Sequence, residues 1–394
     1  MKKNFTYALL LIAMLCTTAA LAQDAPAEEK EDKPTFSLAG SVDTYFHSSF
    51  KTTNPYMGGS YGPSTSFADL RGFSLGMVNL IASYQGEKSG FVGDLVFGPR
   101  GQAAVFGTAS GQAIVNQLYA YYKLSDHVTL NLGQFNTFLG YEVISPAINF
   151  HYSTSYLFSW GPFNHTGLRA DFDFGGGFVG KLAIMNPTDI VEFNPVNTYT
   201  LGAQVGKSGD GGSVYLNFLY GDQDGTLDES DPDEDGFSAG TLFQGDITAS
   251  VNLGESFSLG INASYQTTAA GEELNVDGDV VDSDGDASSF FGVALYPKLT
   301  LSENFSLGLR SEYFAIKNSH LNIFTLDAYD ALNDVNAGDG NVIEFTLSAN
   351  YKVGGLMLIP EFRIDKTSED SFVDKDDKAT DLLTTFSFAA VYKF

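Results

Sequence analysis

The last segment of the chain alternates in character with a period of two, and this alternation constrains the fold more than any other feature. Every second residue is apolar or aromatic, namely Phe386, Phe388, Ala390, Tyr392 and Phe394. The residues between them are smaller or more polar. Because successive side chains of a β-strand point to opposite faces, the segment is predicted to be a strand with one apolar and one mostly polar face.

This ending resembles the C-terminal strand of bacterial outer-membrane barrels, whose final residue is typically Phe. The resemblance implies that Phe386, Phe388, Tyr392 and Phe394 form the signal that the barrel-assembly machinery reads. It also implies that the chain lies in the outer-membrane lipid of a Gram-negative bacterium. The polar face of each strand would then line a lumen.

The first 22 residues have the pattern of a secretory signal peptide. Lys2 and Lys3 form a positive start, residues 8–21 are mostly apolar, and Ala20-Leu21-Ala22 is a small-x-small motif after which cleavage is expected. The only cysteine of the chain, Cys16, lies inside this segment and follows a leucine rather than a small residue. We therefore expect a signal peptide over 1–22, no lipid anchor, and a mature chain without disulfides.

Charge and composition exclude several other classes of protein. Loss of the two signal lysines leaves 21 − 2 = 19 bases against 48 acids, a net charge of −29, which excludes a general nucleic-acid binder. Residues 23–34 are acidic and carry prolines, which predicts a flexible periplasmic leader. The 14% aromatic content is too high for a disordered chain. Beyond the signal, no run of 18 apolar residues predicts a membrane-spanning helix.

Short and long connections alternate along residues 35–394. Short ones, rich in turn-forming residues, lie near 86–90, 125–127, 175–177, 208–212, 254–256, 302–304 and 354–355. Long ones lie near 50–70, 99–111, 135–165, 187–197, 222–240, 269–287, 317–341 and 368–380. Seven turns and eight loops predict about 16 strands in an all-β, antiparallel, up-and-down transmembrane barrel with short periplasmic turns and long external loops. A further hairpin within 135–165 stays open.

Charged residues fall on the polar face of the predicted strands. In 257–265, for example, Phe257, Leu259 and Ile261 oppose Ser258 and Asn262. A soluble β-sandwich would also alternate, but the terminal aromatic residue, the number of strands and the regular connections favour the barrel.

A closed barrel of this size predicts a water-filled lumen. Backbone groups in hydrocarbon must pair within the protein, so the sheet must close, and about 16 strands leave a channel. The predicted channel-lining charges are Asp43, Asp94, Arg169, Asp171, Lys181, Asp246, Arg310, Glu312, Glu344, Lys352, Glu361, Arg363 and Asp365. Their acid excess predicts a mild cation preference. The alternative is that they pair with one another and brace the wall.

The connection over 135–165 is the longest and contains the only tryptophan, Trp160. An apolar loop on the outer surface would be an exposed patch, so we expect it to fold inward and narrow the barrel. The predicted constriction residues are Tyr141, Glu142, Tyr152, Tyr156 and Trp160. A packed inner brace without solute contact is the alternative.

Residues 130–171 also resemble one family. Gly133-Gln134-Phe135, Gly140-Tyr141-Glu142 and His165-Thr166-Gly167-x-Arg169 are similar to the OmpL-like β-barrel porins, the second porin group. The resemblance implies an outer-membrane porin without catalytic residues. The aromatic stretch 152–163 and the acidic loops depart from the family pattern, so the resemblance does not indicate the solute.

Other motifs carry weaker signals. Residues 58–62 match a hydrolase elbow around Ser60, but no strand and helix are predicted to flank it. Asp231, Asp233 and Asp235 begin a calcium-loop pattern, yet Leu242 stands where a bidentate glutamate is required. We expect at most weak Ca²⁺ or Mg²⁺ binding at the acidic external loops, and no cofactor.

The sequence therefore predicts a non-enzymatic porin for passive diffusion of small hydrophilic solutes. The alternatives are a sugar-selective channel, which the aromatic loop residues motivate, and a surface adhesin or receptor that uses the acidic external loops. A hydrolase built on Ser60 is a third. Lipid, the assembly machinery and small solutes are the expected partners, a homo-oligomer stays open, and nucleic acid is excluded.

Overall fold

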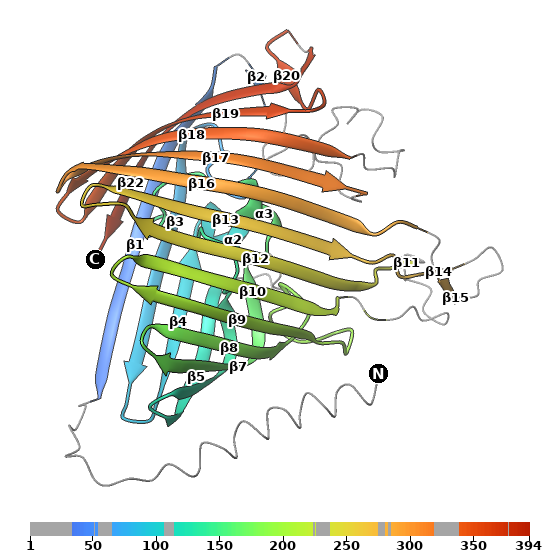
Figure 1. Ribbon diagram of the computed structural model, residues 1–394. Coiled ribbons are helices and arrows are strands. Elements are labelled where there is room, and N and C mark those ends of the chain that lie inside the picture. The colour runs from blue at the N-terminus through green and yellow to red at the C-terminus, as the bar shows by residue number, and fades with distance from the viewer. Residues whose placement is uncertain are drawn as a thin grey trace. The chain divides into compact units, whose positions relative to one another are not determined.

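Sixteen antiparallel strands pair with their neighbours to form one closed barrel (Figure 1). The strands are β1 (Thr35–Ser49), β3 (Gly72–Gln85), β4 (Ser89–Phe97), β5 (Val115–Ser125), β6 (Val128–Asn136), β7 (Asn164–Gly175), β8 (Phe178–Met185), β9 (Thr200–Gly209), β10 (Gly212–Asp222), β12 (Thr241–Asn252), β13 (Phe257–Thr268), β16 (Ser288–Ser302), β17 (Phe305–Lys317), β18 (Gly340–Val353), β19 (Leu356–Thr367) and β22 (Leu382–Lys393). The first and last strands close the barrel, with Ser41 opposite Lys393 and Ser49 opposite Thr385. The predicted all-β barrel and its strand number are confirmed.

The computed structural model describes residues 34–50, 52–53, 65–105, 114–223, 225, 237–274, 280–282, 285–318, 339–376 and 378–394. Two small sheets lie outside the barrel sheet. One pairs β2 (Thr52–Thr53), β20 (Phe372–Asp374) and β21 (Ala379–Thr380); the other pairs β11 (Phe237–Ser238), β14 (Glu272–Leu274) and β15 (Val280–Asp282). The described helices are α2 (Pro99–Ala104) and α3 (Tyr156–Trp160), and none in this part of the chain is long and apolar enough to cross a membrane.

Short turns and long connections alternate around the barrel, as the sequence predicted. The seven turns are two to four residues long, and the eight longer connections all emerge at the opposite end. Within the connection from β6 to β7 the only regular element is α3, so it contains no further hairpin.

The pleat of the strands points large apolar side chains away from the barrel interior. Along β13, Phe257 and Tyr265 are exposed, whereas Asn262 and Ser264 are buried. Along β22, Phe388 and Tyr392 are exposed and Ser387 is buried, and Phe394 beyond the strand is also exposed. The outer face is therefore a continuous apolar surface of the kind that contacts hydrocarbon.

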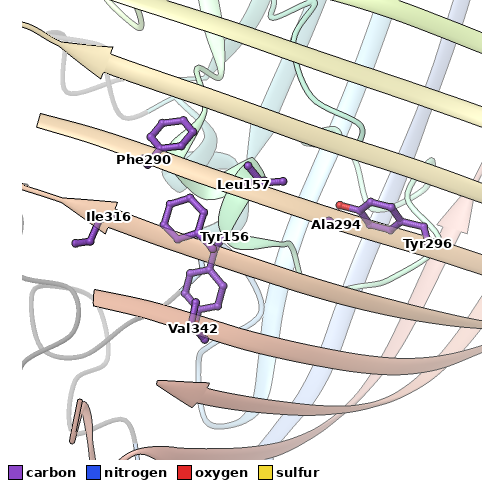
Figure 2. Packing of buried hydrophobic residues seen from close by; sticks show 8 residues of the cluster. Tyr156, Leu157, Phe290, Ala294, Tyr296, Ile316 and Val342 are labelled. Atoms are coloured by element: carbon purple, nitrogen blue, oxygen red, sulfur yellow. The ribbon is translucent and has the colours of Figure 1, made fainter. Parts of the chain in front are cut away.

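Near the ends of β16, β17 and β18 the inner face is apolar, which the sequence did not predict. Phe290, Phe314, Ile316 and Val342 are buried there around α3 and its Tyr156 (Figure 2). A polar inner face is needed only where water reaches it. Here α3 excludes water, so an apolar face is the stable one.

Several predictions fall outside the described residues. They are the signal peptide over 1–22, the leader up to residue 33, the motif around Ser60, and the weak calcium candidates Asp231, Asp233 and Asp235.

Candidate solute passage

The connection between β6 and β7 runs along the inner wall of the barrel, and residues 137–163 are named the inner segment here. At its start the Gly140 amide donates to Asp246 on β12 (3.1 Å), and the Tyr141 amide donates to Asn262 on β13 (3.3 Å). Farther on, His151 is hydrogen-bonded to Ser348 on β18 (2.7 Å). The inner segment thus contacts strands on several sides of the barrel.

Wall carboxylates accept hydrogen bonds from the irregular backbone of the inner segment. Glu361 on β19 accepts from the Tyr152 and Ser153 amides (2.8 and 3.0 Å). Glu312 on β17 accepts from the Tyr156 and Leu157 amides (2.8 and 2.7 Å). A buried backbone N–H without a partner is costly, and an ionised carboxylate supplies acceptors only. These acids therefore fix the path of the inner segment.

Arg310 on β17 is the most extensively bonded of the docking side chains. Its side chain has no exposed surface, and it pairs with Glu344 on the wall (3.1 Å) and with Glu142 of the inner segment (2.8 Å). It also donates to the carbonyl oxygen of Ser153 (2.8 Å). One guanidinium thus joins the wall to two points of the inner segment.

Two further polar contacts continue this docking. The guanidinium of Arg363 pairs with Asp365 (2.7 Å) and donates to the Thr154 carbonyl (2.8 Å). The Tyr152 hydroxyl donates to Asp43 on β1 (2.6 Å). All of these charged groups are buried and hydrogen-bonded, as buried charges must be to persist.

Inward-facing glycines receive apolar side chains of the inner segment. A methyl group at Gly202, Gly260 or Gly308 would overlap the rings of Phe138, Tyr141 and Phe150 respectively. The wall at these positions is bare backbone, which lets each ring approach closely. These three glycines, named the glycine sockets here, leave space for the rings. Replacing any of them with a larger residue would displace the ring that packs against it.

Arg100 of α2 connects a second external connection to the inner segment. Its guanidinium donates to the carbonyl oxygens of Ile144 and Tyr152 (both 3.1 Å) and lies over the ring of Phe67 (4.3 Å). Phe67 also belongs to an apolar cluster that includes Phe158 and Phe163. The inner segment is thus held by the connections above it as well as by the wall.

Asp189, in the connection from β8 to β9, anchors the last turn of the inner segment. Its carboxylate accepts from the Phe163 and Asn164 amides (2.8 and 2.7 Å). Burial raises the pKa of Asp189 from 3.8 to about 6, although the two amides oppose this shift. The anchor therefore titrates close to physiological pH.

Docking at Asp189 should weaken as the pH rises from about 4 to above 6. Over this range the folded state still binds a proton that the unfolded state has lost. The free energy of unfolding therefore falls by up to ~3 kcal/mol as the pH rises. Urea titration of Trp160 fluorescence, the only tryptophan signal, should give a lower midpoint at pH 7.5 than at pH 5. Asp189→Asn keeps an acceptor oxygen but does not titrate, and it should flatten this dependence. A pH dependence equal in both proteins would contradict the assignment.

The space that the inner segment leaves lies against β5 to β12. A cavity of about 820 Å³ is bounded there by Phe138, Gly140 and Tyr141 of the inner segment and by polar side chains of the wall. Arg169, Asp171 and Lys181 line it together. The Arg169 guanidinium pairs with Asp171 (2.8 Å), and the Lys181 ammonium lies 3.3 Å from the same carboxylate.

Nine of the thirteen predicted channel-lining charges are buried rather than exposed to lumen water. They are Asp43, Asp94, Asp246, Arg310, Glu312, Glu344, Glu361, Arg363 and Asp365. The inner segment or neighbouring amide side chains cover these nine, an arrangement that fits the alternative in which they brace the wall. The other four are Arg169, Asp171 and Lys181, which line the cavity, and Lys352, which is exposed near the end of β18.

The predicted constriction residues divide in the same way. Only Tyr141 lines the cavity. Glu142, Tyr152 and Tyr156 are buried against the wall, and Trp160 is half-buried beside the apolar cluster of α3. The positions of these four side chains fit the alternative of a packed inner brace.

Sequence reasoning missed the glycine sockets, Arg100 and Asp189. The glycines could have been noticed in the sequence, since Gly202, Gly260 and Gly308 interrupt the polar faces of their strands. A glycine at such a position often marks a place where another group packs closely against the backbone. Arg100 and Asp189 lie in connections whose paths have no periodic pattern. No local signal marks them.

No hydrolytic site is apparent among the described residues. His151, Ser348 and Glu361 form a hydrogen-bonded chain, but the glutamate bonds the serine rather than the histidine, and all three are buried. Burial and the nearby Arg310 and Arg363 hold the pKa of His151 well below its usual value. Over the same part of the chain, no three acidic, histidine or cysteine side chains are grouped to hold a metal ion.

Solved structures of outer-membrane proteins share this fold. The channel DcaP of Acinetobacter baumannii is similar with a TM-score of 0.57 at 13% identity, over 94% of this chain and 100% of that one. An anion-selective porin from Comamonas acidovorans gives 0.55 at 13%, over 92% and 100%. The trimer form of OmpT, an outer membrane protein of Vibrio cholerae, gives 0.54 at 12%, over 92% and 100%. No curated protein matches the sequence.

A closed 16-stranded barrel with an apolar exterior and an inner segment between its fifth and sixth strands defines an outer-membrane barrel of the porin class. A family model confirms the assignment over residues 35–394. The chain belongs to the family described as "putative beta-barrel porin-2, OmpL-like". Family and fold point to a channel rather than an enzyme.

Proposed function

We propose that the protein is a diffusion porin, which lets small hydrophilic solutes pass down their gradient between the inner segment and the β5–β12 wall. The observation that carries the proposal is the polar cavity beside Tyr141, which lies between the docked inner segment and the β5–β12 wall. A passage bounded by charged and amide side chains keeps solutes hydrated and excludes apolar ones.

The geometry favours a channel over a barrel that only anchors surface loops. An anchor needs no water-filled interior, whereas Arg169 and Lys181 stand on an inner wall that water reaches. The acidic external segments that motivate an adhesin, such as 226–236, lie outside the described residues. The trimer form of OmpT supports a homo-oligomer as part of the proposal.

Swelling of proteoliposomes tests this function. Vesicles containing the purified barrel should swell quickly in an isotonic pentose solution and slowly in a large oligosaccharide. Vesicles with heat-denatured protein serve as the control. If folded protein, shown by its heat-dependent electrophoretic mobility, gives no swelling with any solute, the diffusion porin is excluded and the anchor is favoured.

A further inference from the structure

The charges of the inner face are distributed unevenly between the two halves of the barrel. Where the inner segment docks, the strand acids Asp43, Asp246, Glu312 and Glu361 are buried and accept hydrogen bonds from the inner segment. Such acids have little field left in the water of the lumen, because their charge is already matched by oriented donors. The acid excess of the sequence therefore says little about the passage.

Toward the short-turn end, the inner face of the described barrel strands carries mostly bases. Lys298, Lys352 and Lys393 each lie two residues beyond a buried inward side chain, namely Tyr296, Asn350 and Val391. They therefore point inward by the period of the strand. None of the three is in an ion pair within the described residues.

Three more bases extend this set, against only two strand acids. Lys123 is opposite Thr129, which shares the inner face with buried Asn131, and Arg169 and Lys181 line the cavity. The inward acids at this level of the described strands are Asp171 and Asp173. Six bases stand against these two acids and Asp126, which belongs to the turn after β5 and lines the cavity, and the local charge is +3 in a chain whose total is strongly negative.

Arg169 and Lys181 share a single carboxylate, Asp171, as their ion-pair partner, and Asp126 and Asp173 line the same cavity without an ion pair to either base. Arg169 uses its Nε and Nη2 atoms on Asp171, and its guanidinium rests on the ring of Phe135 (4.3 Å). Both bases remain partly exposed to the cavity, with side-chain exposures of 12% and 24%. A forked guanidinium beside an ammonium matches the geometry of a carboxylate.

Acids of the turns do not cancel this field. Glu87, Asp210, Glu255 and Glu303 lie in the other short turns with Lys88, at the mouth of the barrel. Charges in bulk water are screened within about 8 Å at physiological ionic strength. Charges on the wall of a narrow lumen act on every passing solute, since low-dielectric walls focus their field.

We propose that the short-turn half of the lumen is an anion-attracting vestibule, in which Arg169 and Lys181 form a subsite for small carboxylates and similar anions. This inference rests on the proposed diffusion porin. It reverses the cation preference that the sequence predicted, because the charges that water reaches differ in sign from the total.

Reversal potentials in planar bilayers test the proposal, first with a gradient of potassium chloride and then of potassium acetate. The wild type should prefer the anion in both salts. Lys181→Gln should lower the anion-to-cation permeability ratio by up to roughly fivefold, the effect of one charge near a hydrated ion. The double variant Lys123→Gln/Lys298→Gln removes two charges of the vestibule and leaves Arg169, Asp171 and Lys181 unchanged. It should lower the permeability ratio as well.

Lys207→Gln is the matched control, because it removes the same charge on the outer face of the neighbouring strand β9, where the ammonium lies over the ring of Phe178. It should leave the ratio unchanged. A wild type that prefers potassium, or a ratio that responds equally to all three variants, would overturn the anion vestibule but not the porin. A folded protein that never conducts would overturn the porin itself.

Discussion

Arg310→Gln should release the inner segment from the wall and raise the single-channel conductance severalfold. The substitution removes a buried guanidinium that pairs with both Glu142 and Glu344. It leaves the Glu142 carboxylate without a counter-ion and the Glu344 carboxylate with only the more distant Arg363 (3.8 Å). Breaking a buried pair in this way typically costs about 3–5 kcal/mol. Because the barrel strands keep their backbone pairing, we expect the cost to fall on the docked inner segment.

Two measurements check this result together. Conductance in planar bilayers reports the open cross-section, and Trp160 fluorescence reports whether α3 still packs against its apolar cluster. Lys366→Gln is the control, because its partner Asp381 and the lysine itself are both exposed, and exposed pairs contribute only ~0–1 kcal/mol. Unchanged conductance and fluorescence in folded Arg310→Gln would show that the guanidinium does not hold the inner segment.

Gly308→Ala should displace Phe150 and weaken docking, although only one methyl group is added. The new methyl would overlap the Phe150 ring, and the rigid ring has to move as a whole. Overpacking of this kind costs about 1–3 kcal/mol. We expect a lower urea midpoint of Trp160 fluorescence and more open-state noise in single-channel records.

A double substitution separates overlap from a general effect on the strand. Gly308→Ala combined with Phe150→Ala should cost less than the sum of the single changes, because the methyl then occupies space that the ring has left. Gly209→Ala is the matched control, since nothing lies within 4 Å of a methyl there. Strictly additive single and double variants would contradict the socket.

The barrel could be predicted from the sequence because its signals are local. The alternation in 257–265 needs only the period of a strand, and the short connections carry residues that favour tight turns. Strand number and the positions of the long connections followed from these two patterns. The apolar inner face around Phe314 could not, because it depends on α3 packing against it from a distant part of the chain.

The roles of the inward charges could not be predicted for the same reason. Glu312 and Asp171 occupy equivalent positions on the polar faces of their strands, yet one is buried beneath the inner segment and the other lines the cavity. The difference lies in the path of residues 137–163, which has no repeat to read. A count of charges therefore predicts a cation preference, whereas the location of the charges that water reaches is the basis of the proposed anion preference.

The central claim is that water passes through the barrel beside a docked inner segment. Single-channel conductance of the wild type in a graded series of neutral polymers tests it most directly. We predict a steady conductance that only polymers small enough to enter the passage reduce, and a larger polymer cut-off for Arg310→Gln. A folded wild type with no conductance, or one with the same cut-off as the variant, would contradict the account.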